Sequence, residues 1–139
     1  MRVLVDTCVI SEVRHPNGLR QVKDAVSALH PGDVFFSVIT IGELTAGIAR
    51  LAAGARRDGL TAWLAGLEAG YADRILPVDT AVAQRWGEMT ANCRESGKRL
   101  AVSDGLIAAT ASFHGMAVMT RNEKDFAATG VRIINPWDR

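Results

Sequence analysis

Four acidic residues of this chain stand where a carboxylate can do chemistry. Asp6 and Asp125 follow short apolar runs, whereas Glu43 and Asp104 fall in the first turns of predicted helices. Carboxylates that converge within a few ångströms repel one another, which raises their pKa values unless a cation lies between them. A hard divalent ion such as Mg²⁺ or Mn²⁺ takes oxygen ligands, can generate hydroxide and can stabilise charge on a phosphoryl group. If they converge, the four acids predict a metal site that cleaves phosphodiester bonds.

Each acid also has an ordinary structural interpretation. Glu43 stands three residues after Thr40, which is the spacing of a capping box. Asp104 could complement a helix dipole, and Asp125 could be a turn residue. Asp6 is harder to explain in this way, because the end of a buried strand is an unfavourable place for an unpaired carboxylate. The joint pattern therefore favours a site over four separate structural roles.

The elements that must position these acids alternate between strands and helices. Short apolar runs predict strands at 3–5, 34–37, 74–78, 117–120 and 131–134. Helical spacing of apolar residues predicts helices at 19–29, 40–51 and 57–71. It predicts a fourth helix that is capped by Asp79 or Thr80 and ends near Gly97, and a fifth that is capped by Ser103 and ends at Gly115. This order predicts a single α/β domain over 1–139, with a central, mostly parallel sheet of about five short strands and helices on both faces.

In such a sheet the functional site lies outside the carboxyl ends of the strands. Asp6, Glu43 and Asp125 meet this test directly, because each follows a strand or begins a helix that leaves this edge. Asp104 does not follow from strand order, since its helix leads back toward the fourth strand. Its placement depends on how the long preceding helix returns.

The composition narrows the class of protein. The 139 residues include 16 Lys and Arg against 15 Asp and Glu, which argues against binding nucleic acid by bulk charge. Cys8 and Cys93 match no metal or redox spacing. No apolar run approaches the roughly 20 residues of a membrane span, so a cytoplasmic protein with no membrane contact is expected. If four acids hold a metal, the remaining charged side chains are net basic.

Other acid-dependent or nucleotide-binding modules on similar sheets fit less well. A HAD-type phosphatase needs a second aspartate two positions after the first, where this chain has Cys8. A phosphoacceptor receiver needs an acid pattern that 34–37 and 75–78 do not supply. Neither GxGxxG nor GxxxxGK[ST] is present, which disfavours a nucleotide-binding module.

Four ordered segments of the chain resemble the motifs of PIN-domain ribonucleases. They are 4–12, 37–47, 103–111 and 120–126, and the closing Asn135-Pro136-Trp137 is similar to the FitB-like branch of the VapC toxins. The resemblance covers essentially the whole chain. It implies a Mg²⁺- or Mn²⁺-dependent endoribonuclease that is the toxin of a type II toxin–antitoxin pair.

The resemblance also implies roles for individual residues. Asp6, Glu43 and Asp104 carry over as the acidic core. Some relatives place a fourth acid where this chain has Asn122 and others where it has Asp125, and only Asp125 is acidic here. Whether one or two metal ions bind stays open. The chain could also be a catalytically weak subunit that is kept for binding its antitoxin.

Side chains around the acids have two interpretations. Thr7 and Thr120 either hydrogen-bond a ligand carboxylate or a metal-bound water, or cap a helix, and Asn122 belongs to the same outer layer. Four basic residues are either candidates for drawing RNA toward the acidic pocket or plain solvated surface, namely Arg94, Lys98, Arg99 and Arg121.

The resemblance implies partners as well. Relatives are commonly homodimers that assemble with a VapB- or FitA-like antitoxin into larger complexes, and they contact operator DNA mainly through that antitoxin. The apolar stretches 41–51 and 60–67 could dock a partner segment, although core packing explains the same residues.

Overall fold

The computed structural model describes residues 1–138, which form a five-stranded sheet in the order β3-β2-β1-β4-β5. The strands are β1 (Val3–Val5), β2 (Val34–Ser37), β3 (Ile75–Leu76), β4 (Ala117–Met119) and β5 (Ile133–Ile134). Every neighbouring pair is parallel. The predicted α/β architecture is therefore confirmed, with β1 at the centre of the sheet.

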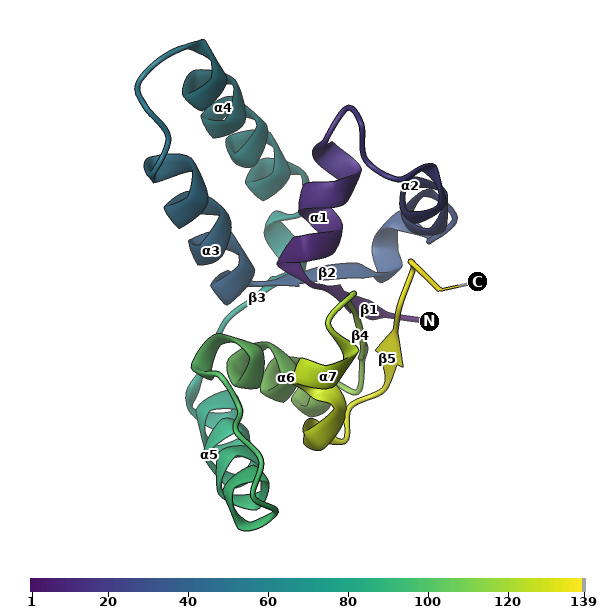
Figure 1. Ribbon diagram of the computed structural model, residues 1–139, viewed down its shortest axis with the longest axis vertical. Coiled ribbons are helices and arrows are strands. Elements are labelled where there is room, and N and C mark those ends of the chain that lie inside the picture. The colour runs from purple at the N-terminus through teal and green to yellow at the C-terminus, as the bar shows by residue number, and fades with distance from the viewer. Residues whose placement is uncertain (139) are drawn as a thin grey trace.

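Seven helices in the described part of the chain cover the sheet on both sides (Figure 1). They are α1 (Thr7–Arg14), α2 (Arg20–Ser27), α3 (Val38–Ala49), α4 (Ala55–Gly70), α5 (Thr80–Glu95), α6 (Val102–His114) and α7 (Glu123–Phe126). In Figure 1, α1 to α4 lie above the strands and α5 to α7 lie below them. No helix within residues 1–138 is both long and apolar enough to cross a membrane.

The sheet separates two apolar clusters, because successive side chains of a strand point to opposite faces. Val3, Val5 and Phe36 pack with α1 to α4, whereas Leu4 and Val118 pack with α6 and α7. The three central strands are almost wholly buried. Side chains that follow these strands are thus held on a rigid base.

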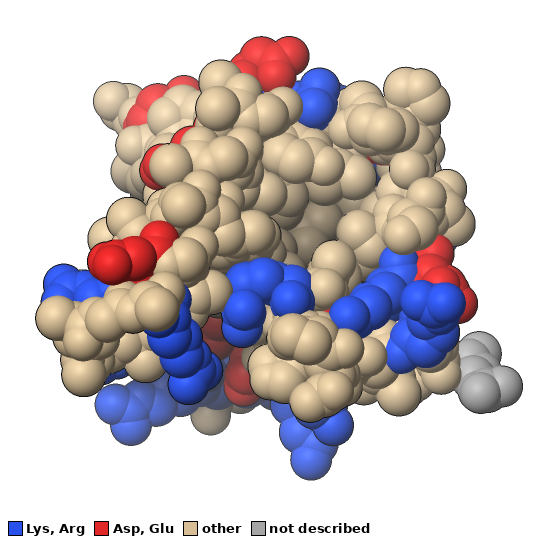
Figure 2. All heavy atoms as spheres, turned by 90° about the horizontal axis from the view of Figure 1, so that it is seen from above, with Lys and Arg blue, Asp and Glu red and all other residues tan. Residues whose placement is uncertain are grey.

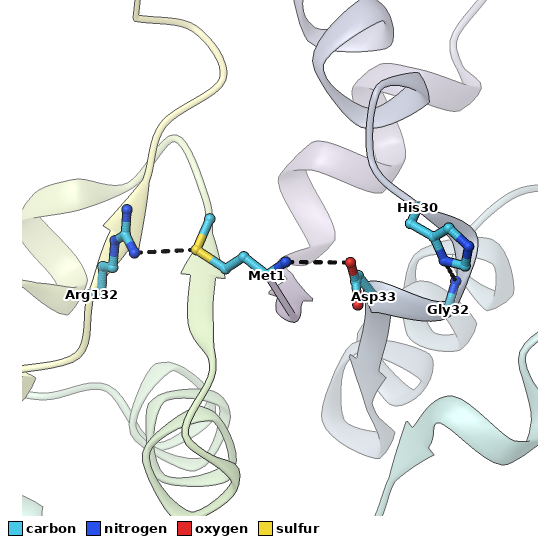
Figure 3. Close-up of polar contacts among 5 residues, drawn as sticks. All are labelled: Met1, His30, Gly32, Asp33 and Arg132. Atoms are coloured by element: carbon cyan, nitrogen blue, oxygen red, sulfur yellow. Dashed lines mark hydrogen bonds and ion pairs between the residues drawn. The ribbon is translucent and has the colours of Figure 1, made fainter.

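The amino edge of the sheet, where the chain begins, carries paired charges. The amino group of Met1 donates to Asp33 Oδ2 at 3.3 Å, and Arg132 Nη1 contacts Met1 Sδ at 3.2 Å (Figure 3). In the same view, Gly32 N donates to His30 Nδ1 at 3.0 Å and shapes the turn before β2. These contacts tie β1 to β2 and β5 at the end away from the candidate site.

Several helix starts differ from the prediction. Helix α1 lies outside the predicted helix ranges and begins at Thr7, directly after Asp6. Helix α3 begins at Val38, two residues before the predicted Thr40, because Ser37 Oγ accepts from Ile39 N at 3.0 Å. Helix α6 begins after Ala101, so Ser103 lies inside it and is not its cap. Asp79 caps α5 by accepting from Val82 N at 2.9 Å, as predicted.

Candidate active site

Asp6 is a buried carboxylate at the junction between β1 and α1. Its side chain is only 5% exposed, and its backbone N–H still bonds to Met119 O of β4 at 2.9 Å. One carboxylate oxygen accepts from Thr7 N at 2.9 Å and thereby caps α1. The other oxygen accepts from Thr120 Oγ1 at 2.8 Å. The strand end therefore fixes both the position and the orientation of this carboxylate.

Two threonines orient the acids. Thr120 is fully buried after β4, and its hydroxyl accepts from Asn122 N at 3.0 Å while it donates to Asp6. Thr7 is the first residue of α1, and its hydroxyl donates to Glu43 Oε1 at 2.7 Å. The interpretation of Thr7 as a helix cap is wrong, because Asp6 fills that position.

Glu43 lies in the second turn of α3, because this helix begins earlier than predicted. The capping box with Thr40 does not form. The Thr40 hydroxyl is buried and has no hydrogen-bond partner among the described residues. Glu43 is half-buried and bonds to Thr7 of α1, so its role lies between two helices and not at a helix end.

Asp104 occupies the first turn of α6 and is half-buried. Burial, followed by the negative charges of Asp125, Asp6 and Glu43 in that order, raises the pKa of its carboxyl group from 3.8 to about 6. All four acids are therefore close enough to interact electrostatically. This convergence includes the acid that strand order alone left unplaced.

Helix packing explains how Asp104 reaches this place. Helices α5 and α6 lie against each other along their length (Figure 1). A Cβ atom on Gly105 would lie 2.8 Å from Trp86 Nε1, closer than packed atoms approach. Only glycine lets α6 pack this closely on α5 beside Asp104. Sequence reasoning missed Trp86 and Gly105 as supports of the site, because one sequence does not show which two helices pack together.

Asp125 lies in the four-residue helix α7 and is exposed. Its charge is the largest electrostatic cause of the raised pKa of Asp104. Asn122 begins the same helix, and its backbone N–H bonds to Thr120 while its carbonyl accepts from Asp125 N at 3.0 Å. The arrangement favours Asp125 over Asn122 as the fourth acidic position.

The PIN domain family model matches residues 3–131. This chain belongs to the PIN domain family. The PIN domain is 38% identical to toxin FitB of Neisseria gonorrhoeae over 136 residues, which is 97% of this chain and 98% of that protein. It is 37% identical to VapC ribonuclease Y4jK of Sinorhizobium fredii over 137 residues, 98% of each chain. It also matches the crystal structure of FitAcB from Neisseria gonorrhoeae with a TM-score of 0.94 and 37% identity, over 99% of both chains.

The acids of this PIN domain have the donor chemistry of a site for a hard cation. They offer only carboxylate oxygens, and no ion pair in residues 1–138 involves them. Residues 1–138 nevertheless contain no group of three His, Cys, Asp or Glu side chains already arranged as metal ligands. Asp6 and Glu43 are engaged by Thr120 and Thr7 instead.

Cys8 borders the site but does not add a charged ligand to it. Its Sγ atom lies 3.6 Å from both Asp6 Oδ2 and Thr120 Oγ1. Burial raises the pKa of the thiol above its usual value of 9.0, so the group stays neutral at physiological pH. Cys93 is buried in the core, as expected.

The predicted RNA-binding residues lie in two places. Arg94, Lys98 and Arg99 are exposed and line one cavity at the end of α5, just before the connection to α6. Arg121 stands beside α7, with its guanidinium carbon 5.2 Å from the centre of the Trp137 ring. No ion pair in the described part of the chain engages these four side chains.

A groove on the α1–α4 side approaches the acidic cluster. Its walls include Thr7 and Glu43 next to the apolar Ile48, Leu60 and Trp63. Figure 2 looks onto this side and shows a hollow among mostly uncharged side chains, bordered by Lys and Arg. The stretches 41–51 and 60–67 thus line a groove as well as contributing to the core.

Proposed function

We propose that this PIN domain is a Mg²⁺- or Mn²⁺-dependent endoribonuclease and the toxin of a VapBC-like type II toxin–antitoxin pair. The observation that carries the proposal is the approach of four carboxylates at one edge of the sheet, where burial and then the charges of Asp125, Asp6 and Glu43 raise the pKa of Asp104. The names of its relatives, a toxin and a VapC ribonuclease, point to the same activity.

The acidic cluster is the proposed catalytic and metal-binding centre. Asp6, Glu43, Asp104 and Asp125 would hold the cation, which would neutralise their repulsion and stabilise charge on the phosphodiester. Thr120 keeps one oxygen of Asp6 in a fixed orientation, and Thr7 does the same for Glu43. Asn122 supports Thr120 through its backbone N–H.

The RNA backbone is drawn to this centre by the unpaired basic side chains. Arg94, Lys98 and Arg99 form one cluster, and Arg121 stands next to the segment of Asp125. Positive charge around an acidic pocket attracts phosphate, although the chain as a whole is nearly neutral. We propose phosphate contacts for all four.

The groove between α1, α3 and α4 is the proposed antitoxin site. Related solved structures are a FitAB complex bound to DNA and a DNA-bound VapBC complex of Salmonella typhimurium. The groove in this PIN domain combines apolar walls with Glu43, and Arg14 and Arg56 also line it, so it suits an apolar segment whose basic side chain reaches Glu43. Operator DNA would be contacted through the antitoxin, and we propose a homodimer as the toxin unit.

Cleavage of RNA by the purified chain tests the proposed activity. We expect cleavage with Mg²⁺ or Mn²⁺ that stops with EDTA, and losses of at least about 10³-fold in Asp6→Asn and Asp104→Asn, because each removes charge from the centre. Asp58→Asn, on the exposed first turn of α4, is the matched control and should cleave normally. Cleavage that persists in both site variants would exclude the acidic centre.

The same experiment distinguishes the alternative of a catalytically weak, antitoxin-binding subunit. Such a chain would bind its antitoxin as tightly as an active toxin does. It would nevertheless leave RNA intact with either metal. The observation that favours an active enzyme is the burial of Asp104 beside three other carboxylates, because a purely structural domain gains nothing from keeping it there.

A further inference from the structure

The C-terminal segment 135–138 contacts the segment that carries Asp125 at two residues. Asn135 Nδ2 donates to Glu123 Oε2 at 2.9 Å. The Trp137 ring lies under the Arg121 guanidinium, 5.2 Å from ring centre to carbon. Arg121 and Glu123 both precede Asp125 by a few residues, so the two contacts act on the strand-to-helix connection that sets its place.

This C-terminal segment is itself anchored elsewhere. The side-chain amide of Gln21 in α2 contacts the carbonyl oxygens of Pro136, Trp137 and Asp138 at 3.2, 2.9 and 3.0 Å. Trp137 N donates to Asn135 Oδ1 at 2.9 Å, and the Trp137 ring packs against the core on the α1–α4 side. Pro136 is buried. The segment is thus held by α2 and the core, independently of α7.

Helix α7 is short, and besides its contact with α6 it is held by the bond of Asn122 N to Thr120 Oγ1 at its start and by Phe126 at its end. It contains four residues, and the Asn122 side chain makes no capping hydrogen bond in the described structure. Phe126 anchors its end in the core, but Asp125 itself is exposed. A helix of one turn is not stable by itself, so contacts from outside must hold it.

We propose that Asn135 and Trp137 are positioning residues that hold α7, and with it Asp125, against the other three acids. The inference rests on the proposed function, because it treats Asp125 as a member of the active centre. Within residues 1–138, neither side chain makes a hydrogen bond to any of the four acids, so each acts through the 121–125 segment. The charge of Asp125 acts on Asp104 more strongly than those of Asp6 and Glu43, so a displacement of α7 would change the centre directly.

A pair of substitutions isolates the contact of Asn135. Asn135→Asp keeps the Oδ1 acceptor for Trp137 N but turns the donating amide into a carboxylate that faces Glu123. Adding Glu123→Gln to the same chain restores a hydrogen bond with donor and acceptor exchanged. Asn92→Asp makes the same chemical change on the exposed face of α5 and is the matched control.

Amide hydrogen exchange of the metal-free protein tests the hold without relying on activity. We expect the Asp125 amide to exchange about tenfold faster in Asn135→Asp, because a charge-assisted hydrogen bond is replaced by repulsion. Glu123→Gln in the same chain should restore the slow rate, and Asn92→Asp should not change it. An unchanged rate in Asn135→Asp, or no recovery in the double variant, would overturn the proposal.

Trp137 is tested in the same way by two variants of different shape. Trp137→Leu removes the aromatic face below Arg121, whereas Trp137→Phe retains it. We expect faster exchange at Asp125 in the leucine variant and a rate near that of wild type in the phenylalanine variant. Equal rates in the two variants would limit the positioning role to Asn135 and overturn it for Trp137.

Mn²⁺ binding, measured by titration calorimetry, tests whether the hold matters to the centre. Asn135→Asp should weaken Mn²⁺ binding severalfold. In a chain that already carries Asp125→Asn, it should cause no further loss, because Asn135 acts on the metal only through the carboxylate of Asp125. Equal affinities of wild type and Asn135→Asp would show a structural contact only and overturn the functional role. A wild-type chain that binds no Mn²⁺ would instead contradict the proposed metal centre, and the exchange rates would still decide the positioning.

Discussion

The two halves of the acidic cluster are held in opposite ways. Asp6 and Glu43, here named the hydrogen-bonded half, accept bonds of 2.7 to 2.9 Å from Thr7 and Thr120. Asp104 and Asp125, named the repelled half, accept no side-chain hydrogen bond in residues 1–138, and burial followed by the charges of the other acids raises the pKa of Asp104. One half is oriented by hydrogen bonds, whereas in the other Asp104 is held in place despite its burial and the charges of its neighbours.

The difference follows from the elements that carry each half. Asp6 follows the central strand β1 and is bonded to Thr120 after the adjacent β4, within the most buried part of the molecule. Asp104 lies in α6, which reaches the site through its packing on α5, and Asp125 lies in the short helix α7. Functional sites commonly keep such destabilising features because activity needs them.

The largest expected stability effect lies in the hydrogen-bonded half. Asp6→Ala should lower the free energy of unfolding by about 2 kcal/mol, because it removes the cap of α1 and leaves the buried Thr120 hydroxyl without its acceptor. Urea denaturation measures this change. Asp58→Ala, on the exposed start of α4, should change stability by less than about 0.5 kcal/mol. An equally small effect in Asp6→Ala would show that the fold does not depend on this carboxylate.

A divalent cation should relieve the repelled half. At a concentration ten times its dissociation constant, Mg²⁺ or Mn²⁺ should stabilise the wild type by about 1.4 kcal/mol. That corresponds to a rise in Tm of about 5 °C for a domain of this size. Thermal unfolding followed by circular dichroism measures it, and Asp58→Asn should show the same rise. No rise with either metal would count against a cation at this site.

Asp104→Asn should stabilise the metal-free protein at pH 7.5 by about 1 kcal/mol. This value is smaller than the pKa shift of Asp104 alone would give, because its carboxyl group is partly solvated. The folded pKa of about 6 lies above the unfolded value of 3.8, so burial of the neutral form favours folding at low pH. This contribution is lost as the pH rises through 6.

The pH series separates this effect from simple repacking. The advantage of Asp104→Asn should be absent near pH 3.8, grow between pH 4 and 7, and then stay constant, as measured by urea denaturation in steps of pH. A constant advantage at every pH would mean that the asparagine packs better and that the charge of Asp104 is not strained.

The sequence was sufficient for the sheet and for singling out four acids that the fold brings near one another, because strand ends and helix starts carry recognisable patterns. Their roles as metal ligands stay a prediction. It misplaced Glu43 by one turn, since Ser37 and Thr40 are both plausible caps and only the three-dimensional structure shows Thr40 buried. It could not place Asp104, because that depends on the close packing of α6 on α5 at Gly105. Long-range packing of this kind leaves no local pattern in one sequence.

The contacts of the C-terminal segment were beyond reach for the same reason. Asn135 and Trp137 stand in an irregular tail, and their partners lie 12 or more residues away. Arg139 falls outside the described residues. The role of such a tail follows from the segments that it contacts in the folded protein and not from its composition.

The smallest expected effect is within the hydrogen-bonded half itself. Thr7→Val should lower the free energy of unfolding by about 0.5 kcal/mol, because Thr7 and Glu43 are only half-buried and water can replace the lost hydroxyl. Thr7→Ser retains the donor and should match the wild type, and Thr61→Val, which removes an exposed hydroxyl bond to Arg57 O, is the control for the shape change. Urea denaturation in triplicate resolves a difference of this size only against these controls. A loss near 2 kcal/mol would show that the Thr7–Glu43 bond contributes as much as the bond between Thr120 and Asp6, and that the whole hydrogen-bonded half is shielded from water. A loss near 0.5 kcal/mol would show that the rigid part of the cluster is the single junction of β1 with β4.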